Sequence, residues 1–420
     1  MTPSATLLAL REPLDLEWVE RSAVERGEPE FLRRSRADAA ARANVTAWPT
    51  GQEEEWRRFP PAAIPASPLI GARSTATLTA DDLPKGVYVG DLEAAVRDRP
   101  ELVEPWLEAG GRVHTHEAIT TTTAALWSTG TFVYVPRGVA LRAPVTSERV
   151  WAPGDAAYLS RTIVVAEQES SVTFVEDVSS SGGSKPHVAI PHVEVHVGPG
   201  ADVRYIHLQR YADDVWDIGA QWYGSDRDSR LASYNVLLGS TRTKLGVVSD
   251  IRGNAAEVKL YGLVAAGEEQ RIDVNSLQRL DGRASQSDLL YLSALYGSAK
   301  ATFYGVVRVE PTSSATGSYQ ECRNLLLSDK AGANPIPVLE ILTNDVARCG
   351  HGATAGRLDE EEVFYVLSRG IDRTTAEQLL VRGSFARVID RIPDESIRAR
   401  VLDALRPRIG RVAEIEMAAA

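Results

Sequence analysis

The sequence predicts a mainly β protein in which a parallel β-helix is flanked by helical regions at both ends. From about residue 113, short runs of alternating or β-branched residues follow one another for roughly 230 residues, each bounded by Gly, Ser, Asp or Asn. Two-residue Asn-Gly and Asp-Gly hairpin turns are few there, so stacked coils fit this stretch better than hairpins. Apolar residues recur at helical spacing before and after it. A large double-sheet jelly roll is the alternative architecture.

We assign residues 1–112 to an N-terminal helical region that contains a proline-rich linker. Residues 16–44 alternate apolar and charged side chains at helical spacing. Four prolines between residues 59 and 72 exclude a regular helix and predict an extended arm. A further helix is predicted over residues 91–111, with Asp91 as its N-cap and glycines at its end.

Residues 113–350 form the predicted β-helix core. In a β-helix every rung pairs with the next, and the inward side chains form continuous ladders. The predicted strands begin at irregular intervals of about 14 to 28 residues, which is typical of stacked coils. In chain order the runs are TFVYVPRGV, RTIVVAEQ, SSVTFVEDV, HVEVHVG, ADVRYIHLQ, RLASYNVLLG, AEVKLYGLVA and ATFYGVVRVE.

Residues 351–420 are predicted to be helical again. Asp359 is placed to cap a helix, with Glu362 three residues later in a capping-box pattern, and Gly370 is placed to end it. A last helix is predicted to start at Pro393. An apolar stripe in this region is broad enough for a core or a partner, and it consists of Leu379, Leu380, Phe385, Val388, Ile389 and Ile392.

Composition and charge exclude several classes of function. The net charge of −11 argues against nucleic-acid binding. No apolar run reaches the roughly 18 residues of a membrane span, and the start of the chain does not resemble a secretory signal. Two cysteines do not make a disulfide framework, so the predicted compartment is the cytoplasm. The sequence contains neither a phosphate-binding P-loop nor a Gly-x-Ser-x-Gly nucleophile motif.

The stretch RCGHGATAG, residues 348–356, contains the first candidate site. Cys349 and His351 are two residues apart on a predicted strand and therefore share one face. Thiolate and imidazole are good ligands for iron or zinc, but two ligands do not complete a site. A metal site here would take its remaining ligands from a second protein. Cys322 either lies on a neighbouring coil or is a buried, unreactive thiol.

A second candidate site is formed by His192, Glu194 and His196, three metal-ligand residue types on one strand face. The valines that alternate with them favour a simpler interpretation, in which the row is the solvent side of an amphipathic strand. His114 and His116 are interpreted in the same way. Two alternative functions follow: a self-sufficient metal-binding protein that uses this row, and a solenoid carbohydrate-active enzyme with carboxylates along a groove.

A long, ordered signature runs through residues 319–371. It consists of Asn324 to Ser328, Pro337 to Glu340, Asp345–Val346, Cys349-x-His351–Gly352–Ala353–Thr354, Gly356, Phe364–Tyr365 and Ser368–Arg369–Gly370. This signature closely resembles the SufB/SufD family of iron–sulfur cluster assembly proteins. Looser similarity at residues 132–139, 197–205 and 303–311 extends the resemblance over most of the chain.

Within this family the chain resembles SufD-type subunits. SufB-type chains place a cysteine in the stretch that here reads DKAGANPIP and has Ala331, and they have a glutamate where Gly352 stands. They also often have an N-terminal cysteine cluster, whereas no cysteine precedes Cys322 in this chain.

The resemblance implies a right-handed parallel β-helix in a cytosolic, non-catalytic scaffold subunit that works with a SufB-type paralogue and the ATPase SufC. The β-helices of the two paralogues pair, and the nascent cluster forms transiently between them. A SufB cysteine and His351 would hold it, with Cys349 as a neighbour on the same face. The chain alone would hold no cofactor stably; a flavin in the complex and a homodimer of the isolated subunit are left open. SufC would dock on the C-terminal helices, in a region that comprises Phe364, Tyr365, Ser368, Arg369, Leu379, Leu380 and Phe385.

The chain also departs from the family pattern within the predicted β-helix. Leu280 stands where a histidine is common, Leu292–Ser293 where Lys–Gly is common, and Tyr304 where asparagine is usual. We interpret these differences as divergence within the scaffold.

Overall fold

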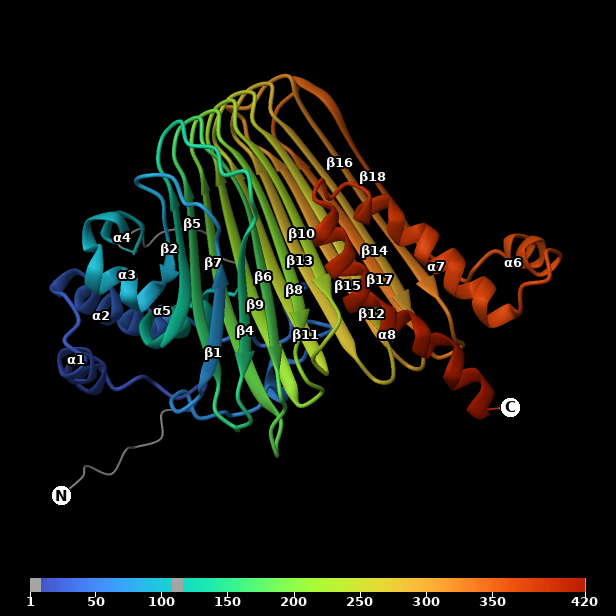
Figure 1. Cartoon of the computed structure of the whole chain (residues 1–420), viewed down its shortest axis with the longest axis horizontal. Helices are drawn as coiled ribbons and strands as arrows, with labels where there is room; N and C mark the ends of the chain where they lie inside the picture. The colour runs from blue at the N-terminus through green and yellow to red at the C-terminus, as the bar shows by residue number, and fades with distance from the viewer. Residues whose placement is uncertain (1–8, 108–115, 420) are drawn as a thin grey trace.

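A computed structural model describes residues 9–107 and 116–419, with side chains as far as residue 409. Two sheets face each other along the molecule, with helices at both ends (Figure 1). From β3 onward the chain alternates between the sheets, so that even-numbered strands form one sheet and odd-numbered strands the other. Successive coils pair in parallel in both the even sheet and the odd sheet. The prediction of a mainly β fold with a β-solenoid core is confirmed, and the parallel pairing excludes the jelly roll.

Each sheet has nine strands within the described residues, and its first pair is antiparallel. The even sheet contains, in spatial order, β1 (Ser74–Thr79), β4 (Val145–Trp151), β6 (Ser171–Ser180), β8 (Asp202–Arg210), β10 (Arg230–Leu237), β12 (Glu257–Ala266), β14 (Gln286–Leu295), β16 (Thr316–Leu326) and β18 (Val346–Gly356). The odd sheet contains β2 (Tyr88–Asp91), β3 (Thr129–Val135), β5 (Tyr158–Ala166), β7 (His187–Val197), β9 (Val215–Ser225), β11 (Arg242–Ile251), β13 (Arg271–Leu280), β15 (Lys300–Val309) and β17 (Gly332–Ile341).

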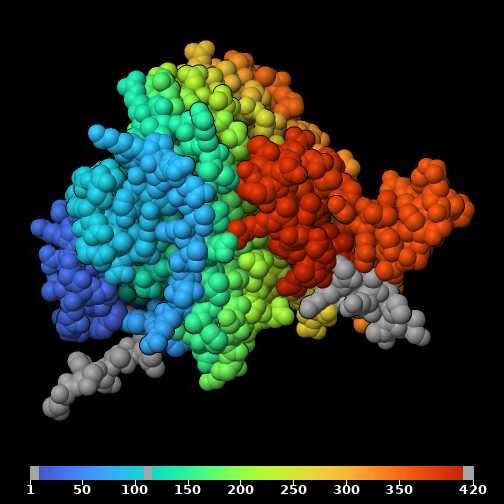
Figure 2. All heavy atoms as spheres, in the orientation of Figure 1, coloured from blue at the N-terminus to red at the C-terminus, as the bar shows by residue number. Residues whose placement is uncertain are grey.

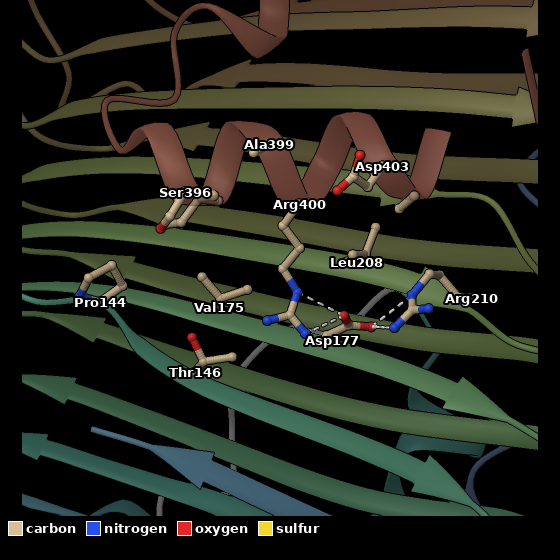
Figure 3. Close-up of a pocket in the computed structure, with 12 residues that line it drawn as sticks. Pro144, Thr146, Val175, Asp177, Leu208, Arg210, Ser396, Ala399, Arg400 and Asp403 are labelled. Carbon is tan, nitrogen blue, oxygen red and sulfur yellow. Dashed lines mark hydrogen bonds and ion pairs between the residues drawn. The ribbon is translucent and has the colours of Figure 1, made fainter. Parts of the chain in front are cut away.

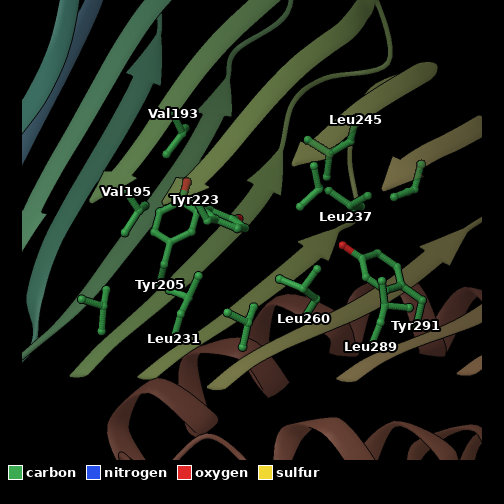
Figure 4. Packing of buried hydrophobic residues seen from close by; sticks show 14 of the residues in the cluster. Val193, Val195, Tyr205, Tyr223, Leu231, Leu237, Leu245, Leu260, Leu289 and Tyr291 are labelled. Atoms are coloured by element: carbon green, nitrogen blue, oxygen red, sulfur yellow. The ribbon is translucent and has the colours of Figure 1, made fainter. Parts of the chain in front are cut away.

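The inward-facing side chains of both sheets form one continuous apolar core. Val195, Leu245, Leu260 and Tyr291 belong to it, and their side chains point into the space between the sheets at successive positions along the solenoid (Figure 4). Side chains alternate between the two faces of a strand, so parallel neighbours in register stack their inward residues in columns from coil to coil. These columns bury apolar surface along the whole solenoid, which is the main favourable term in its stability.

The turns that lead from the odd sheet to the even sheet stack as regularly as the strands. One residue of each turn adopts a left-handed φ between 58° and 73° in four successive coils: Gly138, Glu169, Gly200 and Asp228. Each of these residues donates its backbone N–H to a carbonyl of the next turn at 2.9 Å. The turns therefore continue the hydrogen-bonded ladder around the edge of the solenoid.

The N-terminal helices cover the outer face of the odd sheet. Side chains of these helices form apolar clusters with outward residues of β5, β7 and β9. The elements are α1 (Leu16–Glu25), α2 (Glu30–Val45), the 3-10 turn η1 (Pro61–Ala63), α3 (Leu92–Asp98), α4 (Pro100–Leu107) and α5 (Glu117–Leu126).

Two of these helical elements differ from prediction. The helix predicted over residues 91–111 begins at the expected cap, where Asp91 Oδ1 accepts from the N–H of Glu93 at 2.9 Å, but it breaks before Pro100 into α3 and α4. The predicted glycine end, residues 110 and 111, lies outside the described residues. Helix α5 occupies EAITTTTAAL, where strands were predicted to begin. Its threonine hydroxyls bond back along the helix, as Thr121 Oγ1 does to the Glu117 carbonyl at 2.7 Å.

The proline-rich arm is extended, with one 3-10 turn, but it is buried against the odd sheet. Phe59, Ile64 and Leu69 are core residues of the N-terminal cluster. Beneath the arm, the fully buried Lys244 donates to Asn275 Oδ1 at 2.6 Å, and its Nζ lies 4.7 Å from the Trp56 ring centroid. The segment is therefore part of the domain and not a free linker.

Three C-terminal helices follow the solenoid: α6 (Glu360–Leu367), α7 (Arg373–Ile389) and α8 (Glu395–Ala419). Asp359 caps α6 as predicted, and Gly370 follows its end with a φ of +82°. Helix α8 begins at Glu395, two residues after the predicted start at Pro393, and Asp394 caps it: its Oδ1 accepts from the N–H of Ile397 at 3.0 Å. Helices α7 and α8 pack on the outer face of the even sheet, whereas α6 projects from the body (Figures 1 and 2). No helix in the described ranges is long and apolar enough to cross a membrane.

An ion-pair cluster joins α8 to the even sheet (Figure 3). Asp177, which is buried on β6, accepts from Arg400 of α8 at 2.7 Å through Oδ2 and from Arg210 of β8 at 2.7 Å through Oδ1. Arg400 also pairs with Glu148. A groove of about 740 Å³ lies beside this contact. Both oxygens of Asp177 are held by arginines, so this carboxylate is not free to serve as the acid or base of a carbohydrate-active enzyme.

Candidate functional site

The last strand of the even sheet, β18, contains a β-bulge just before the candidate residues. Thr316 of β16 pairs with Val346, but the next residue, Gly317, pairs with Arg348. Ala347 is therefore an extra residue in the ladder. A single extra residue reverses which side chains of the following segment face the core.

The bulge turns Cys349 and His351 toward the interior of the solenoid. Val346 and Cys349 are three residues apart, yet both pack against the central core, which an uninterrupted strand would not allow. Beyond the bulge, His351 pairs with Gln320, which is buried in the interior on β16. The predicted shared face of Cys349 and His351 is thus present, and it is the inward face.

The coil that carries these residues is the open end of the solenoid. Strands β17 and β18 are last in their sheets, and within the described ranges no further strand pairs with either of them. His351 is consequently exposed although it faces inward, and Cys349 is half-buried. Ile341 and Leu342, at the end of β17, are also exposed. The backbone and side chains of this coil are available to a second protein chain.

The outer face of β18 is occupied by Tyr319 from the preceding coil. A Cβ atom at Gly352 would lie 3.0 Å from the Tyr319 hydroxyl, and one at Gly350 would lie 3.5 Å from its ring. Arg348 lies over the same ring, 5.9 Å from its centroid, and pairs with Asp288 at 2.7 Å. Gly352 thus lets the tyrosine hydroxyl lie close to the strand that presents His351, whereas a Cβ atom at Gly350 would make only an ordinary contact with the ring.

The two cysteines are both free thiols in different surroundings. Cys322 lies on the neighbouring coil but pairs with Ala353 in the ladder, and its burial raises the pKa of its thiol to about 12. Burial also raises the pKa of the Cys349 thiol. Only thiolates are strong ligands, so Cys322 is a packed core thiol, and Cys349 would have to lose its proton to bind a metal ion.

The row of His192, Glu194 and His196 was expected on a solvent face, and this expectation was wrong. All three side chains are buried on β7 beneath the N-terminal helices. Arg161 donates to Glu194 Oε1 from Nε at 3.0 Å and from Nη2 at 2.6 Å. His196 packs against Trp106, with ring centroids 4.5 Å apart. Among the side chains described for residues 9–107 and 116–409, no group of three or more His, Cys, Asp or Glu is arranged to hold a metal ion.

The second histidine pair divides between the described and undescribed parts of the chain. His116 is buried before α5, with its ring centroid 5.1 Å from that of Trp56, and is therefore not on a solvent face as predicted. His114 lies outside the described residues.

Comparison with known proteins identifies the family. A family model described as the SUF system FeS cluster assembly, SufBD core domain, matches residues 150–384, which is more than half of the chain. A second model, the SufBD protein N-terminal region, matches residues 71–146. The chain belongs to the SufBD family of iron–sulfur cluster assembly proteins.

Several SufBD family relatives cover most of the chain. The iron-sulfur cluster assembly protein SufD of Bacillus subtilis is 30% identical over 327 residues, which is 77% of this chain and 74% of that protein. A SufBD family protein of Mycobacterium bovis is 28% identical over 85% of this chain and 88% of its own length. The iron-sulfur cluster assembly protein SufB of Bacillus subtilis is 24% identical over 74% of this chain and 66% of its own length. The first of these supports the resemblance to SufD-type subunits.

The structure separates the predicted docking residues of this SufBD protein into two groups. Phe364 and Tyr365 are 70% and 60% exposed on α6, and Leu379 is 44% exposed on α7. Ser368 and Arg369 are exposed as well, and Leu380 is half-buried. Phe385 differs, because it is fully buried between α7 and the even sheet together with Val388, Ile389 and Ile392. Most of the predicted apolar stripe is therefore core, and only its beginning is free to contact another protein.

Sequence reasoning missed Gln320 and Tyr319, the two neighbours of the candidate residues on β16. A signal was present, because Gln320 is two residues before the buried Cys322 and therefore shares its inward face. A polar residue on the apolar, inward face of a strand needs a hydrogen-bond partner, so its position next to candidate ligands indicates a contact with them.

Proposed function

We propose that this chain is a non-catalytic, SufD-type scaffold subunit in which the open end of the solenoid pairs with a SufB-type paralogue. The observation that carries this proposal is the terminal coil. It presents a strand edge with which no described segment pairs, together with an inward-facing, exposed imidazole and a half-buried thiol. Family membership and 30% identity to a SufD protein supply the functional context.

Within that complex, His351 would be a ligand shared with the partner, and the iron–sulfur cluster would be the cargo of the site. One imidazole and one neighbouring thiol do not close a four-ligand cage. An incomplete site suits transient assembly, because a complete cage would retain the cluster. Cys349 would be the second donor from this chain once its thiol loses a proton.

The ATPase subunit SufC would dock on α6 and the beginning of α7. This part of the proposal is supported by the exposed aromatic pair Phe364 and Tyr365 on a helix that stands away from the solenoid. Exposed aromatic residues on a projecting helix are typical anchors of protein interfaces. The two free thiols fit a reducing compartment, so we assign the complex to the cytoplasm.

The test is the iron and sulfide content of the complex after anaerobic purification with SufB-type and SufC partners. We expect His351→Ala to assemble normally but to lose most of its cluster and the associated visible absorption, because a shared ligand is missing. Thr354→Ala is the matched control, since Thr354 is exposed on the same strand and its backbone carbonyl, which accepts from Asn324, is kept in the variant. An intact His351→Ala complex with unchanged iron and sulfide would refute the shared-ligand role.

A further inference from the structure

Gln320 lies directly behind His351 in the interior of the solenoid. The two residues are ladder partners on adjacent parallel strands, where backbones are about 4.8 Å apart. Gln320 is only 1% exposed, whereas His351 is exposed on the terminal coil. The bulge at Ala347 is what brings the imidazole onto the same inward face as this amide.

The orientation of the Gln320 amide is set by a chain of hydrogen bonds that ends on a backbone carbonyl. The Ser287 carbonyl only accepts, and it accepts from Gln278 Nε2 at 3.2 Å; Ser287 Oγ accepts from the same nitrogen at 2.6 Å. Gln278 must therefore present Oε1 to Gln320, which donates to it from Nε2 at 2.9 Å. The donor side of the Gln320 amide thus faces back into the solenoid.

The acceptor oxygen of the same amide has no such hydrogen bond. Gln320 Oε1 is buried and has no hydrogen-bond partner among the described residues. It reaches across the interior to Gly305 of β15, where a Cβ atom would lie 3.1 Å from it. A buried amide oxygen without a partner costs free energy, so a nearby N–H donor would be favoured there.

A histidine that binds a metal ion through one ring nitrogen usually donates the N–H of the other to a fixed acceptor, which selects the tautomer and orients the ring. We propose that Gln320 is a positioning residue for His351: its Oε1 accepts a hydrogen bond from one imidazole nitrogen, so that the other nitrogen presents its lone pair at the open end of the solenoid. The role of this lone pair as a cluster ligand rests on the proposed function, but the tautomer selection does not.

The test is a measurement of the His351 tautomer in the full-length isolated chain by ¹⁵N NMR of labelled histidine at pH 8, with His351→Asn used to assign the signal. We expect wild type to favour one tautomer roughly tenfold, the value of one net hydrogen bond. Gln320→Met, of similar length but without an acceptor, should give the ratio of a free histidine peptide. Gln320→Glu retains an acceptor and should keep the wild-type preference.

Two results would overturn the inference. One is a folded Gln320→Met protein with the wild-type tautomer ratio. The other is a free-peptide ratio in wild type itself, which decides the matter even if Gln320→Met does not fold. Cluster content in the complex is a separate readout: if His351→Ala keeps its cluster while the tautomer responds to Gln320, the proposed function fails and the positioning role stands.

Discussion

Asp217 is a carboxyl group enclosed in the interior of the solenoid. It lies on β9 and is fully buried; Oδ2 accepts from Gln209 Nε2 at 3.0 Å, while Oδ1 has no partner among the described residues. Burial disfavours the charged form and raises the pKa of Asp217 from 3.8 to about 7. The neutral acid is therefore the form that suits this position.

The raised pKa predicts that Asp217 makes the protein less stable as the pH rises. Between pH 3.8 and about 7 the folded chain holds a proton that the unfolded chain releases, so this contribution to stability is complete below pH 3.8 and is lost by about pH 7. A tenfold difference in proton affinity between the folded and unfolded chains corresponds to roughly 1.4 kcal/mol of stability. Asp217→Asn cannot ionise and should gain stability relative to wild type at pH 8 but not at pH 4.

Denaturant unfolding of wild type and Asp217→Asn at several pH values measures this difference. Asp213→Asn is the matched control, because it removes a carboxylate that is exposed on a nearby turn and not buried inside the solenoid. A stability difference between Asp217→Asn and wild type that does not change with pH would contradict the buried, neutral acid.

One phenylalanine on α6 and one near the end of α7 lie in opposite surroundings. Phe364 is 70% exposed on α6, and Phe385 is completely buried against the even sheet. The two residues have the same chemistry and similar helical settings, so they form a matched pair of variants. What distinguishes them is whether a distant strand lies over the side chain.

We expect Phe364→Ala to weaken SufC binding, because exposed aromatic side chains often anchor interfaces. The free energy of unfolding should change little, because the Phe364 ring is mostly exposed and is not part of the apolar core. Phe385→Ala should instead destabilise the C-terminal helices by about 3–5 kcal/mol through the cavity it leaves. Titration calorimetry with SufC and thermal unfolding separate the two effects. Unchanged SufC affinity of a folded Phe364→Ala protein would remove α6 from the docking surface.

At the scale of the whole molecule, the ion pairs around Asp177 connect the last helix to an early coil of the solenoid. Arg400 and Asp177 are 223 residues apart in the chain, yet their side chains are 2.7 Å apart beneath α8 (Figure 3). Helices α7 and α8 also pack apolar side chains against β10, β12 and β14, and Arg387 of α7 pairs with Glu321 of β16 at 3.0 Å. Because α6 is joined to α7, the anchor on β6 helps to fix where the projecting helix stands.

Arg400→Met should loosen this anchor while leaving the solenoid intact. The buried Asp177 keeps Arg210 as a partner, so we expect a loss of about 1–3 kcal/mol and not the larger penalty of an isolated buried charge. Hydrogen exchange should become faster in α7 and α8 and stay unchanged in β5 to β15. Arg406→Met, at an exposed pair with Asp403, is the control. Equal protection of α8 in both variants would show that the ion pairs of Arg400 do not help to hold the helix.

The sequence by itself determined the class of the fold and the identity of the candidate ligands. Alternation within each strand and helix caps such as Asp91 and Asp359 are local features, so they can be read without the rest of the chain. The ordered signature around Cys349 and His351 likewise indicated the family from the residues alone. These local features did not decide between the solenoid and the jelly roll, because the two architectures differ in which strands pair.

Only the tertiary structure decided which way the important side chains face. The inward phase of His351 depends on the bulge at Ala347, which exists only in the ladder with β16. The burial of Glu194 and of Phe385 depends on segments far away in the chain, the N-terminal helices for one and the even sheet for the other. The periodicity of a strand or helix specifies its apolar and polar faces. The segment that covers each face is determined by long-range packing, which no local stretch of the sequence encodes.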